Sequence, residues 1–437
     1  MNEQALFSEA VTLLLAAGAE DQLLLSDGDT LTFSRRAVRQ AVDTLALLLQ
    51  QAGVQRLALL ADNGPAWLIA DLAALQAGVV VIPLPPFFTP AQMAHVLASA
   101  SVDGLLSPSA LTAAFGFRPL AVQPAATQLG LQLGVRPLNQ QQPLPPGTVK
   151  ITFTSGTTGQ PKGVCLSAAA QLRVAASIGV VCRELSPERH LCLLPLAVLL
   201  ENVAGCYAAL LAGASLVIPP LATVGSEGSS QFDAGRALAT LSRQGANSAI
   251  VVPEMLRAMV QALEGGMLLP TSLRLLAAGG GRISPQLAGR ALALGLPLYE
   301  GYGLSECASV VSLTRPGKQQ AGCAGQPLPH VQLQLDEQGE LLIYGNGFLG
   351  YLGEPPRDVT AAVASGDLAT LDEQGGLHLQ GRRKQLLITG FGRNVAPEWP
   401  EAELLAEDQL LQAVVFGEGQ PLLAALLVTA PECSDTQ

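Results

Sequence analysis

Residues 151–167, ITFTSGTTGQPKGVCLS, bring hydroxyl groups, glycines and a lysine together in one short stretch. Glycines let the backbone approach a phosphate chain closely, hydroxyl and amide groups donate to phosphate oxygens, and a lysine adds a mobile positive charge. An apolar β-branched run precedes the stretch and reads as a strand. We therefore predict a phosphate-binding loop, whose residues are Thr154, Ser155, Gly156, Thr157, Thr158, Gly159 and Lys162.

This loop differs from the GxxxxGK[ST] loop of common nucleoside triphosphatases. Gly163 follows Lys162, and the hydroxyl residues precede the lysine. This order of residues argues against a kinase or a GTPase-like motor. Release of γ-phosphate rather than pyrophosphate would make that class of protein a candidate again. A flexible Ser/Thr/Gly loop would explain the glycines, but not the strand before them or the lysine after them.

Further short motifs follow downstream. They are LAAGGGRIS (276–284), EGYGLSE (300–306), SGDLA (365–369) and GRRKQLLITGFGRNVAPEW (381–399). Each motif alone is better explained by a turn or a salt bridge. A carboxylate such as Glu306 nevertheless suits Mg²⁺, which takes one or two hard oxygen ligands when it bridges phosphates.

Taken together, the motifs resemble the acyl-adenylate-forming (AMP-binding) superfamily, which includes acyl-CoA synthetases, luciferases and peptide-synthetase adenylation domains. TSGTTGQPKG (154–163) is similar to the phosphate loop of that family almost letter for letter, and the other motifs follow in the expected order. The resemblance implies nucleotide-binding roles for both glycine-rich segments. Their residues are Gly279, Gly280, Gly281, Glu300, Gly301, Tyr302, Gly303 and Ser305.

The same resemblance implies individual roles in the site. Tyr302 would flank the adenine, Ser305 stands where the family usually has threonine, and Glu306 would ligate Mg²⁺. Asp367 would hold the ribose hydroxyls and Arg382 the ribose or a phosphate, while Lys384 would be the hinge between a large and a small domain. Thr154, Lys162 and Glu306 form the predicted catalytic set.

The chemistry implied by the resemblance is activation of a carboxylic acid by ATP and Mg²⁺. The carboxylate attacks the α-phosphorus in line, pyrophosphate leaves, and positioning and cations lower the barrier. The acyl group then passes to a thiol of CoA or of an acyl carrier protein. NVAPEW (394–399) resembles long-chain acyl-CoA synthetases more than amino-acid-activating domains, which favours a fatty acid as the substrate.

The C-terminal segment departs from the family pattern. The family places a second lysine in a C-terminal domain of a hundred or more residues, whereas 53 residues follow Lys384 here, with Arg393 as the only basic residue against eight acidic ones. Loss of one such donor would slow adenylation by roughly 10²–10³-fold. Three explanations stay open: a slow enzyme, a lysine from a partner chain, or a partner subunit that binds acyl or nucleotide ligand without reacting.

A second departure lies in LPLAVLLEN (194–202). Long-chain members typically have a histidine at the position of Val198, at the acyl pocket, and Glu201 is retained. The replacement leaves open how the protein would bind the carboxylate of its substrate. A buried helix is also an adequate explanation of Val198.

The surrounding pattern predicts the elements that position these motifs. Residues 31–53 have helical spacing and end at Gly53, 56–63 read as a strand, a second helix begins at Pro65, and 79–86 form a second strand. Strand and helix alternate to about residue 300, which predicts parallel sheets between helices. Residues 330–345 and 368–381 instead show period-two alternation around Glu-Gln-Gly turns, which predicts antiparallel strands.

The predicted fold class is α/β. A large N-terminal domain (1–383) would contain two stacked α/β subdomains (1–147 and 148–315, the latter with the phosphate loop) and a small β-barrel-like subdomain (316–383). A truncated α+β C-terminal domain would follow (384–437).

Composition restricts the partners. The 24 basic and 35 acidic residues give a net charge of −11 without a basic run, which does not support nucleic-acid binding.

Seven cysteines without a CxxC pair, and an N-terminus without a basic signal region, favour a reduced cytoplasmic location. Residues 203–225 are uncharged and long enough for a membrane span, but Gly213, Pro219 and Pro220 interrupt them, so at most peripheral membrane contact is expected.

Overall fold

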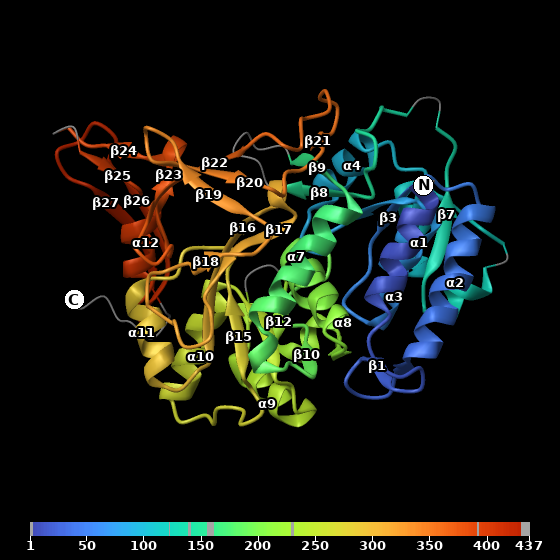
Figure 1. Cartoon of the computed structure of the whole chain (residues 1–437), viewed down its shortest axis with the longest axis horizontal. Helices are drawn as coiled ribbons and strands as arrows, with labels where there is room; N and C mark the ends of the chain where they lie inside the picture. Colours follow the sequence, from blue (N-terminus) through green and yellow to red (C-terminus); the bar gives the residue numbers. More distant parts are fainter. Residues whose placement is uncertain are drawn as a thin grey trace.

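The computed structural model describes residues 3–121, 123–138, 141–154, 161–228, 231–390 and 393–429. Figure 1 shows two α/β parts next to each other, blue to cyan and green to yellow, with an orange β-rich part above them. The red C-terminal segment lies beside the yellow helices α10 and α11. The candidate site is built mainly from the first three of these parts, and Gln385 of the C-terminal segment also lines its cavity.

An eight-stranded sheet forms the centre of the N-terminal part. Its inner strands are parallel and almost wholly buried, as expected for apolar strands between helices. In order across the sheet they are β21 (Gly350–Tyr351), β9 (Lys162–Leu166), β8 (Lys150–Thr154), β4 (Val80–Pro83), β3 (Arg56–Leu59), β5 (Gly104–Ser107), β7 (Gln132–Val135) and β6 (Arg118–Pro119).

Helices cover this sheet. They are α1 (Glu3–Leu14), α2 (Arg35–Gln51), α3 (Pro65–Ala77), α4 (Pro90–Ser99), α5 (Ser109–Thr112), η1 (Ala113–Phe115) and α6 (Pro124–Thr127). The helix predicted from residue 31 begins later, because Thr32–Ser34 pair with β1 and the Ser34 hydroxyl caps α2 by accepting from the Ala37 amide. The helix predicted from Pro65 is confirmed.

A nine-stranded sheet forms the second part, with parallel inner strands and antiparallel edges. Its order is β18 (Gln326–Pro327), β17 (Ser309–Leu313), β16 (Leu298–Leu304), β15 (Leu275–Ala278), β14 (Ser248–Val251), β10 (Arg189–Leu191), β11 (Ser215–Val217), β1 (Leu23–Ser26) and β2 (Thr32–Ser34). The sheets therefore divide the chain differently from the predicted subdomains, because β8 and β9 lie in the first sheet and β1 and β2 in the second.

The elements around the second sheet include a π-helix, η3. They are α7 (Ala168–Val181), η2 (Arg183–Leu185), η3 (Leu200–Tyr207), α8 (Ala208–Leu211), η4 (Leu221–Val224), β12 (Ser226–Glu227), β13 (Gln231–Phe232), α9 (Ala234–Gln244), α10 (Pro253–Glu264), α11 (Pro285–Ala293) and η5 (Ser305–Cys307). Residues 203–225 are thus divided among η3, α8, β11 and η4, which agrees with the interruption expected at Gly213, Pro219 and Pro220. Among the described residues, no helix has both the length and the apolar character needed to cross a bilayer.

A buried polar group joins the two parts. Lys150 Nζ in β8 lies 3.0 Å from Asp71 Oδ1 in α3, and the Tyr207 hydroxyl in η3 donates to Asp71 Oδ2 at 2.7 Å. Asn202 Nδ2 donates to the same oxygen at 3.0 Å, and Lys150 donates to Asn202 Oδ1. Because a buried ion pair is stable only when its remaining hydrogen-bonding groups are satisfied, this network positions β8 relative to η3.

The orange part is a four-stranded antiparallel sheet, in the order β19 (Gln332–Leu335), β20 (Glu340–Tyr344), β22 (Val363–Leu371) and β23 (Leu377–Arg382). Both predicted hairpins are confirmed. Each turn begins with an aspartate whose Oδ1 accepts two backbone amides: Asp336 accepts from Gln338 and Glu340, and Asp372 from Gln374 and Gly376.

The C-terminal segment packs against α10 and α11. Arg257 donates to the Leu405 and Leu410 carbonyls, and Arg290 donates to the Ala406 carbonyl and pairs with Asp408 at 2.9 Å. The elements of the segment are η6 (Arg383–Gln385), β24 (Leu387–Ile388), β25 (Asn394–Val395), α12 (Glu398–Leu404), β26 (Leu410–Phe416) and β27 (Ala424–Thr429).

Candidate active site

The predicted phosphate loop lies between β8 and β9. These strands form an antiparallel hairpin in which Thr154, the last residue of β8, is paired with Lys162, the first of β9. Both ends of the loop are thereby placed, and Thr154 lines the main cavity. The loop residues Ser155, Gly156, Thr157, Thr158 and Gly159 lie outside the described residues, so their role remains a prediction.

Tyr351 connects the two ends of the predicted catalytic set. Its hydroxyl donates to Glu306 Oε1 at 2.9 Å, and Lys162 Nζ lies 5.4 Å from the centre of its ring. Such a distance is within the range of a cation–π contact. Burial and the Glu306 carboxylate raise the pKa of Tyr351, so the phenol remains a donor near neutral pH.

The sequence motifs do not indicate Tyr351. It lies in β21, a two-residue edge strand that pairs with β9 through Tyr351 and Val164. The amide of Phe348 donates to the Glu306 carbonyl at 2.8 Å, which holds this segment against η5. The only local signal is an aromatic residue in GFLGYLGE (347–354), a pattern shared by many edge strands.

Asp367 lies between Tyr302 and Arg382. The Tyr302 hydroxyl donates to Asp367 Oδ2 at 2.5 Å, and Arg382 Nε lies 3.0 Å from Oδ1. Asp367 and Arg382 are paired across β22 and β23. Burial raises the pKa of Asp367, and the Tyr302 hydroxyl and Arg382 oppose that rise. The contact brings the four-stranded sheet against β16, so that three predicted nucleotide-binding residues meet.

The predicted glycines provide close backbone approaches. An added Cβ at Gly279 would lie 3.0 Å from the Gly301 carbonyl oxygen, and one at Gly303 would lie 2.0 Å from that of Ser309. Gly280 has a φ of +82°, which favours glycine. Gly279, Gly280, Gly301 and Gly303 all line the main cavity, where they present peptide planes rather than side chains.

Other predicted residues lie apart from the cavity. Gly281 is exposed and faces Pro253, and Lys384 is exposed in η6. Glu300 is buried, and burial raises its pKa to about 8 while the Gly322 amide opposes the rise. The structure does not bring these residues to the cavity wall; their assigned roles remain predictions.

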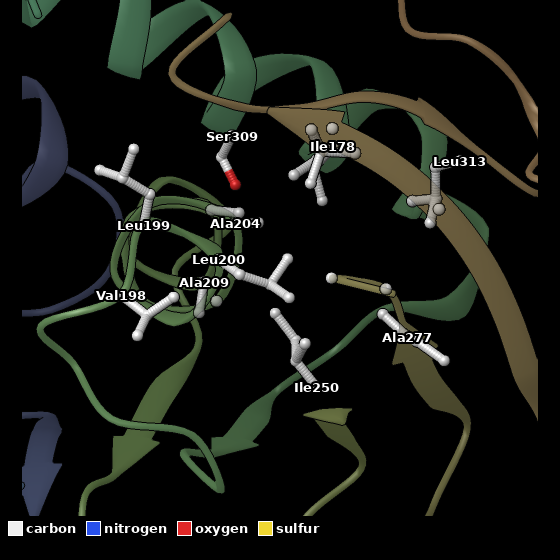
Figure 2. Close-up of a pocket in the computed structure, with 18 of the residues that line it drawn as sticks. Ile178, Val198, Leu199, Leu200, Ala204, Ala209, Ile250, Ala277, Ser309 and Leu313 are labelled. Atoms are coloured by element: carbon white, nitrogen blue, oxygen red, sulfur yellow. The ribbon is translucent and has the colours of Figure 1, made fainter. Parts of the chain in front are cut away.

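The main cavity has a volume of about 1390 Å³. At one end it is lined by predicted site residues, which are Thr154, Gly279, Gly280, Gly301, Tyr302, Gly303, Ser305, Glu306 and Arg382. The rest of its wall is mainly aliphatic and contains many alanines. Figure 2 shows Ile178, Leu200 and Ile250 pointing toward a common space, with Ala277 and Leu313 at its side.

Val198 lies at this wall, where the resemblance places a histidine (Figure 2). A different histidine, His190, lines the cavity with Ser248. His190 Nε2 is 2.8 Å from Glu201 Oε1, and its Nδ1 is 3.1 Å from Ser248 Oγ. The other Glu201 oxygen accepts the Leu194 amide at 2.9 Å. The retained Glu201 therefore orients His190 and the loop that contains Val198, a role the sequence did not predict.

Comparisons with known proteins identify the family. Residues 15–352 match a family model described as AMP-binding enzyme. The chain is 30% identical over 423 residues to a feruloyl-CoA synthase from an Amycolatopsis species, covering 90% of this chain and 82% of that protein. It is 36% identical over 159 residues to the long-chain-fatty-acid–CoA ligase FadD15 of Mycobacterium bovis, and that match spans 35% of this chain and only 26% of the ligase.

Solved structures show the same fold. An anthranilate CoA ligase, AuaEII, in complex with anthranoyl-AMP has a TM-score of 0.81 at 18% identity, covering 98% of this chain and 88% of that chain. The O-succinylbenzoate coenzyme A synthetase of Bacillus subtilis, in complex with AMP, has a TM-score of 0.78 at 21% identity, covering 98% and 89%.

Proposed function

Because the chain belongs to the AMP-binding enzyme family, we propose that it uses ATP to activate a carboxylic acid as an acyl-adenylate, with release of pyrophosphate. We propose further that the acid is a fatty acid and that a thiol, of CoA or of a carrier protein, accepts the acyl group. The comparisons support an acid–CoA ligase in general, and the finer assignments rest on the cavity.

The continuity of the cavity carries the proposal. One end is lined by Tyr302, two glycine turns, Glu306 and Arg382. The wall beyond these residues is mainly aliphatic. A nucleotide needs the first environment and an acyl chain the second. Since both line a single cavity, the carboxyl carbon of an acid in the apolar part would face a nucleotide phosphate at the polar end.

Asp367 and Tyr302 are suited to the nucleoside. The Asp367 carboxylate is held by Tyr302 and Arg382, so its geometry is established before a ribose hydroxyl donates to it. The Arg382 side chain is 52% exposed against 10% for Asp367, which leaves guanidinium N–H groups available to a phosphate or ribose oxygen. Tyr302 places its ring beside the glycine turns, where an adenine would stack.

Glu306 fits a magnesium ion. It is half-buried at the cavity wall, and Tyr351 satisfies Oε1 as a neutral donor, so no cation pairs directly with the carboxylate in the described contacts. Mg²⁺ commonly takes one or two carboxylates and completes its shell with phosphate oxygens and water. Bound there, it would neutralise phosphate charge during the reaction.

The chain itself would position the reactants and stabilise charge. Lys162 begins β9 opposite Thr154, so its ammonium group and the Thr154 hydroxyl enter the region of the phosphates from facing strands. The acid oxygen forms a bond to the α-phosphorus while the bond from that phosphorus to the bridging oxygen of pyrophosphate breaks. This displacement requires no covalent intermediate with the protein.

The aliphatic wall favours a fatty acyl group. Small residues from η3, α8 and β15 leave room along the cavity. Among the larger apolar residues of its wall, leucine, isoleucine and valine outnumber the three phenylalanines, Phe87, Phe88 and Phe153. The feruloyl, succinylbenzoate and anthranilate specificities belong to the relatives so named.

Pyrophosphate exchange tests the proposal. Purified protein is mixed with ATP, Mg²⁺ and labelled pyrophosphate, together with saturated fatty acids of increasing length, ferulate or 2-succinylbenzoate. We expect incorporation of label into ATP that is greatest with a fatty acid. Exchange only with the aromatic acids would contradict the substrate assignment. Binding of ATP without exchange for any acid would contradict the activity and support a ligand-binding homologue.

A further inference from the structure

Three side chains with metal-binding atoms meet at the edge of the four-stranded sheet, away from the cavity. Asp372 and His378 flank the β22–β23 turn, and Cys323 precedes β18 of the nine-stranded sheet. The Cys323 Sγ, one Asp372 oxygen and one His378 ring nitrogen all lie within 4.8 Å of one another. Cys323 is buried, whereas the Asp372 and His378 side chains are 33% and 30% exposed. Solvent can therefore reach two of the three side chains.

His378 is oriented as a metal ligand. Its Nδ1 lies 3.1 Å from the Gly322 carbonyl oxygen, and its Nε2 lies 3.1 Å from Asp372 Oδ2. Both partners are acceptors, so a neutral imidazole can donate to only one of them. With Nδ1–H donated to Gly322, Nε2 faces Asp372 Oδ2 either as the N–H of an imidazolium or as a lone pair that shares a bound cation with the carboxylate. A backbone carbonyl that holds the second ring nitrogen is the usual outer-shell partner of a metal-bound histidine.

Asp372 presents a single oxygen to the group. Its Oδ1 accepts the Gln374 and Gly376 amides, each at 2.8 Å, so the turn holds that oxygen and leaves Oδ2 facing His378. An added Cβ at Gly376 would lie 2.4 Å from Asp372 Oδ2 and 2.9 Å from Cys323 Sγ. Glycine at this position therefore allows the sulfur and the carboxylate to approach each other.

A metal ion would bind Cys323 as the thiolate, which is the form of cysteine that binds metals. The bound cation would stabilise that thiolate and release the thiol proton to solvent.

We propose that Cys323, Asp372 and His378 bind a zinc ion, with water in the fourth position. Cysteine sulfur, imidazole nitrogen and carboxylate oxygen are the ligands that Zn²⁺ takes in tetrahedral sites. The Zn–ligand lengths of roughly 2.0–2.3 Å place such atoms about 3.3–3.7 Å apart. The 3.1 Å contact of His378 with Asp372 is close to that spacing, and the Cys323 sulfur lies within 4.8 Å of both ligand atoms.

The zinc ion would join two sheets. Cys323 belongs to the segment that leads into the nine-stranded sheet, and the other two ligands belong to the four-stranded sheet with Asp367. The backbones already meet here, since the Ala324 amide donates to the Leu377 carbonyl at 2.8 Å and the Leu377 amide donates to Gly325 at 2.9 Å. The metal would add a side-chain link to this junction.

A second group of potential ligands is less suitable. His190, Cys192 and Glu201 also lie close together, but all three are buried. Both ring nitrogens of His190 already have partners of the right kind, because Glu201 can accept from Nε2 and the Ser248 hydroxyl can donate to Nδ1. His190 therefore does not face two acceptors, and its contacts give no reason to place a cation beside it.

Metal titration of the untagged, full-length protein tests the proposal without measuring catalysis. After chelator treatment and dialysis, we expect one Zn²⁺ or Co²⁺ per chain. The Co²⁺ form should show a thiolate charge-transfer band and the visible bands of a tetrahedral ion. Cys323→Ser should abolish the charge-transfer band. His378→Gln and Asp372→Asn should weaken Zn²⁺ binding by more than the roughly 10–100-fold that loss of an outer-shell partner causes.

A control variant and a second use of Asp372→Asn make the outcome decisive. Cys182→Ser removes a buried thiol elsewhere and should leave the Co²⁺ spectrum unchanged. Asp372→Asn keeps an oxygen for the two amides of the turn, so it remains informative if Cys323→Ser does not fold. Zn²⁺ should raise the Tm of the wild type but not that of Asp372→Asn. Absence of stoichiometric metal, or a Co²⁺ spectrum that is lost in Cys192→Ser and retained in Cys323→Ser, would overturn the proposal.

Discussion

The hydroxyl of Tyr351 donates a 2.9 Å hydrogen bond to the carboxylate of Glu306, 45 residues away in sequence. The same ring lies under the ammonium group of Lys162. Tyr351 thus contacts both a carboxylate and a cation, and these two groups form no direct ion pair among the described contacts. A direct pair would compete with magnesium for one group and with phosphate for the other.

Tyr351→Phe keeps the ring beside Lys162 and removes only the donor to Glu306. A hydrogen bond to a charged group contributes about 1.5 kcal/mol at the lower end of its range, so we expect kcat/KM for pyrophosphate exchange to fall roughly tenfold. Tyr344→Phe, in β20, is the matched control and should leave exchange unchanged. Equal activity of both variants would exclude a role for the Tyr351 hydroxyl.

Asp367→Ala should weaken ATP binding more than it slows the chemical step. A ribose contact is present in the ground and transition states alike, so KM for ATP should rise while kcat changes little. Asp336→Ala removes a turn aspartate of the neighbouring hairpin and serves as the control. A fall in kcat with an unchanged KM would place Asp367 at the reacting phosphate instead.

Ala277→Leu should shorten the preferred acyl chain. Ala277 lies on β15 at the apolar wall (Figure 2), and leucine there would take the space of about three carbons. Each excluded CH₂ costs about 0.8 kcal/mol of apolar contact, so kcat/KM for the longest acids should fall on the order of 50-fold. Short acids should be unaffected. Ala98→Phe on the exposed face of α4 is the control, and a uniform loss for all chain lengths would contradict the cavity assignment.

Glu300 should make stability depend on pH. Burial raises the pKa of its carboxyl from 4.5 to about 8, so the folded state holds a proton between these values that the unfolded state has lost. The free energy of unfolding should therefore be highest below about pH 4.5 for this group and fall as pH rises toward 8, by roughly 5 kcal/mol at most.

Urea unfolding of wild type and Glu300→Gln at several pH values measures this contribution. Glutamine keeps the shape without the ionisation, so the variant should lose that part of the pH dependence. At pH 8 it should be the more stable protein. Parallel curves for the two proteins would mean that Glu300 is not buried as an acid.

Lys150→Met should destabilise the protein by about 3–5 kcal/mol, because it leaves the Asp71 charge buried without its partner. Lys150→Met combined with Asp71→Leu should recover much of this loss, since both charges are then absent. Chemical denaturation of the two variants and the wild type provides the comparison. Additive losses would show that the buried ion pair contributes no coupling.

Several features were predictable because they depend on local order. The apolar runs and helical spacing of residues 56–83 indicated the alternating strands and helices, and the Glu-Gln-Gly turns indicated both antiparallel hairpins. The motif order indicated the family and the α/β fold class, which the comparisons confirm. The exact start of α2 was not predictable, because pairing of Thr32–Ser34 with β1 overrides the helical pattern.

By itself, the sequence determined the residue types of the site, because phosphate and magnesium chemistry require hydroxyls, glycines, a lysine and a carboxylate in recognisable local patterns. Only the tertiary structure decided which distant side chains meet. Tyr351 reaches Glu306 from an edge strand, Glu201 orients His190 at the apolar wall, and Cys323 lies near His378 across two sheets. Such contacts depend on sheet order and on side-chain direction, which vary independently of any short motif.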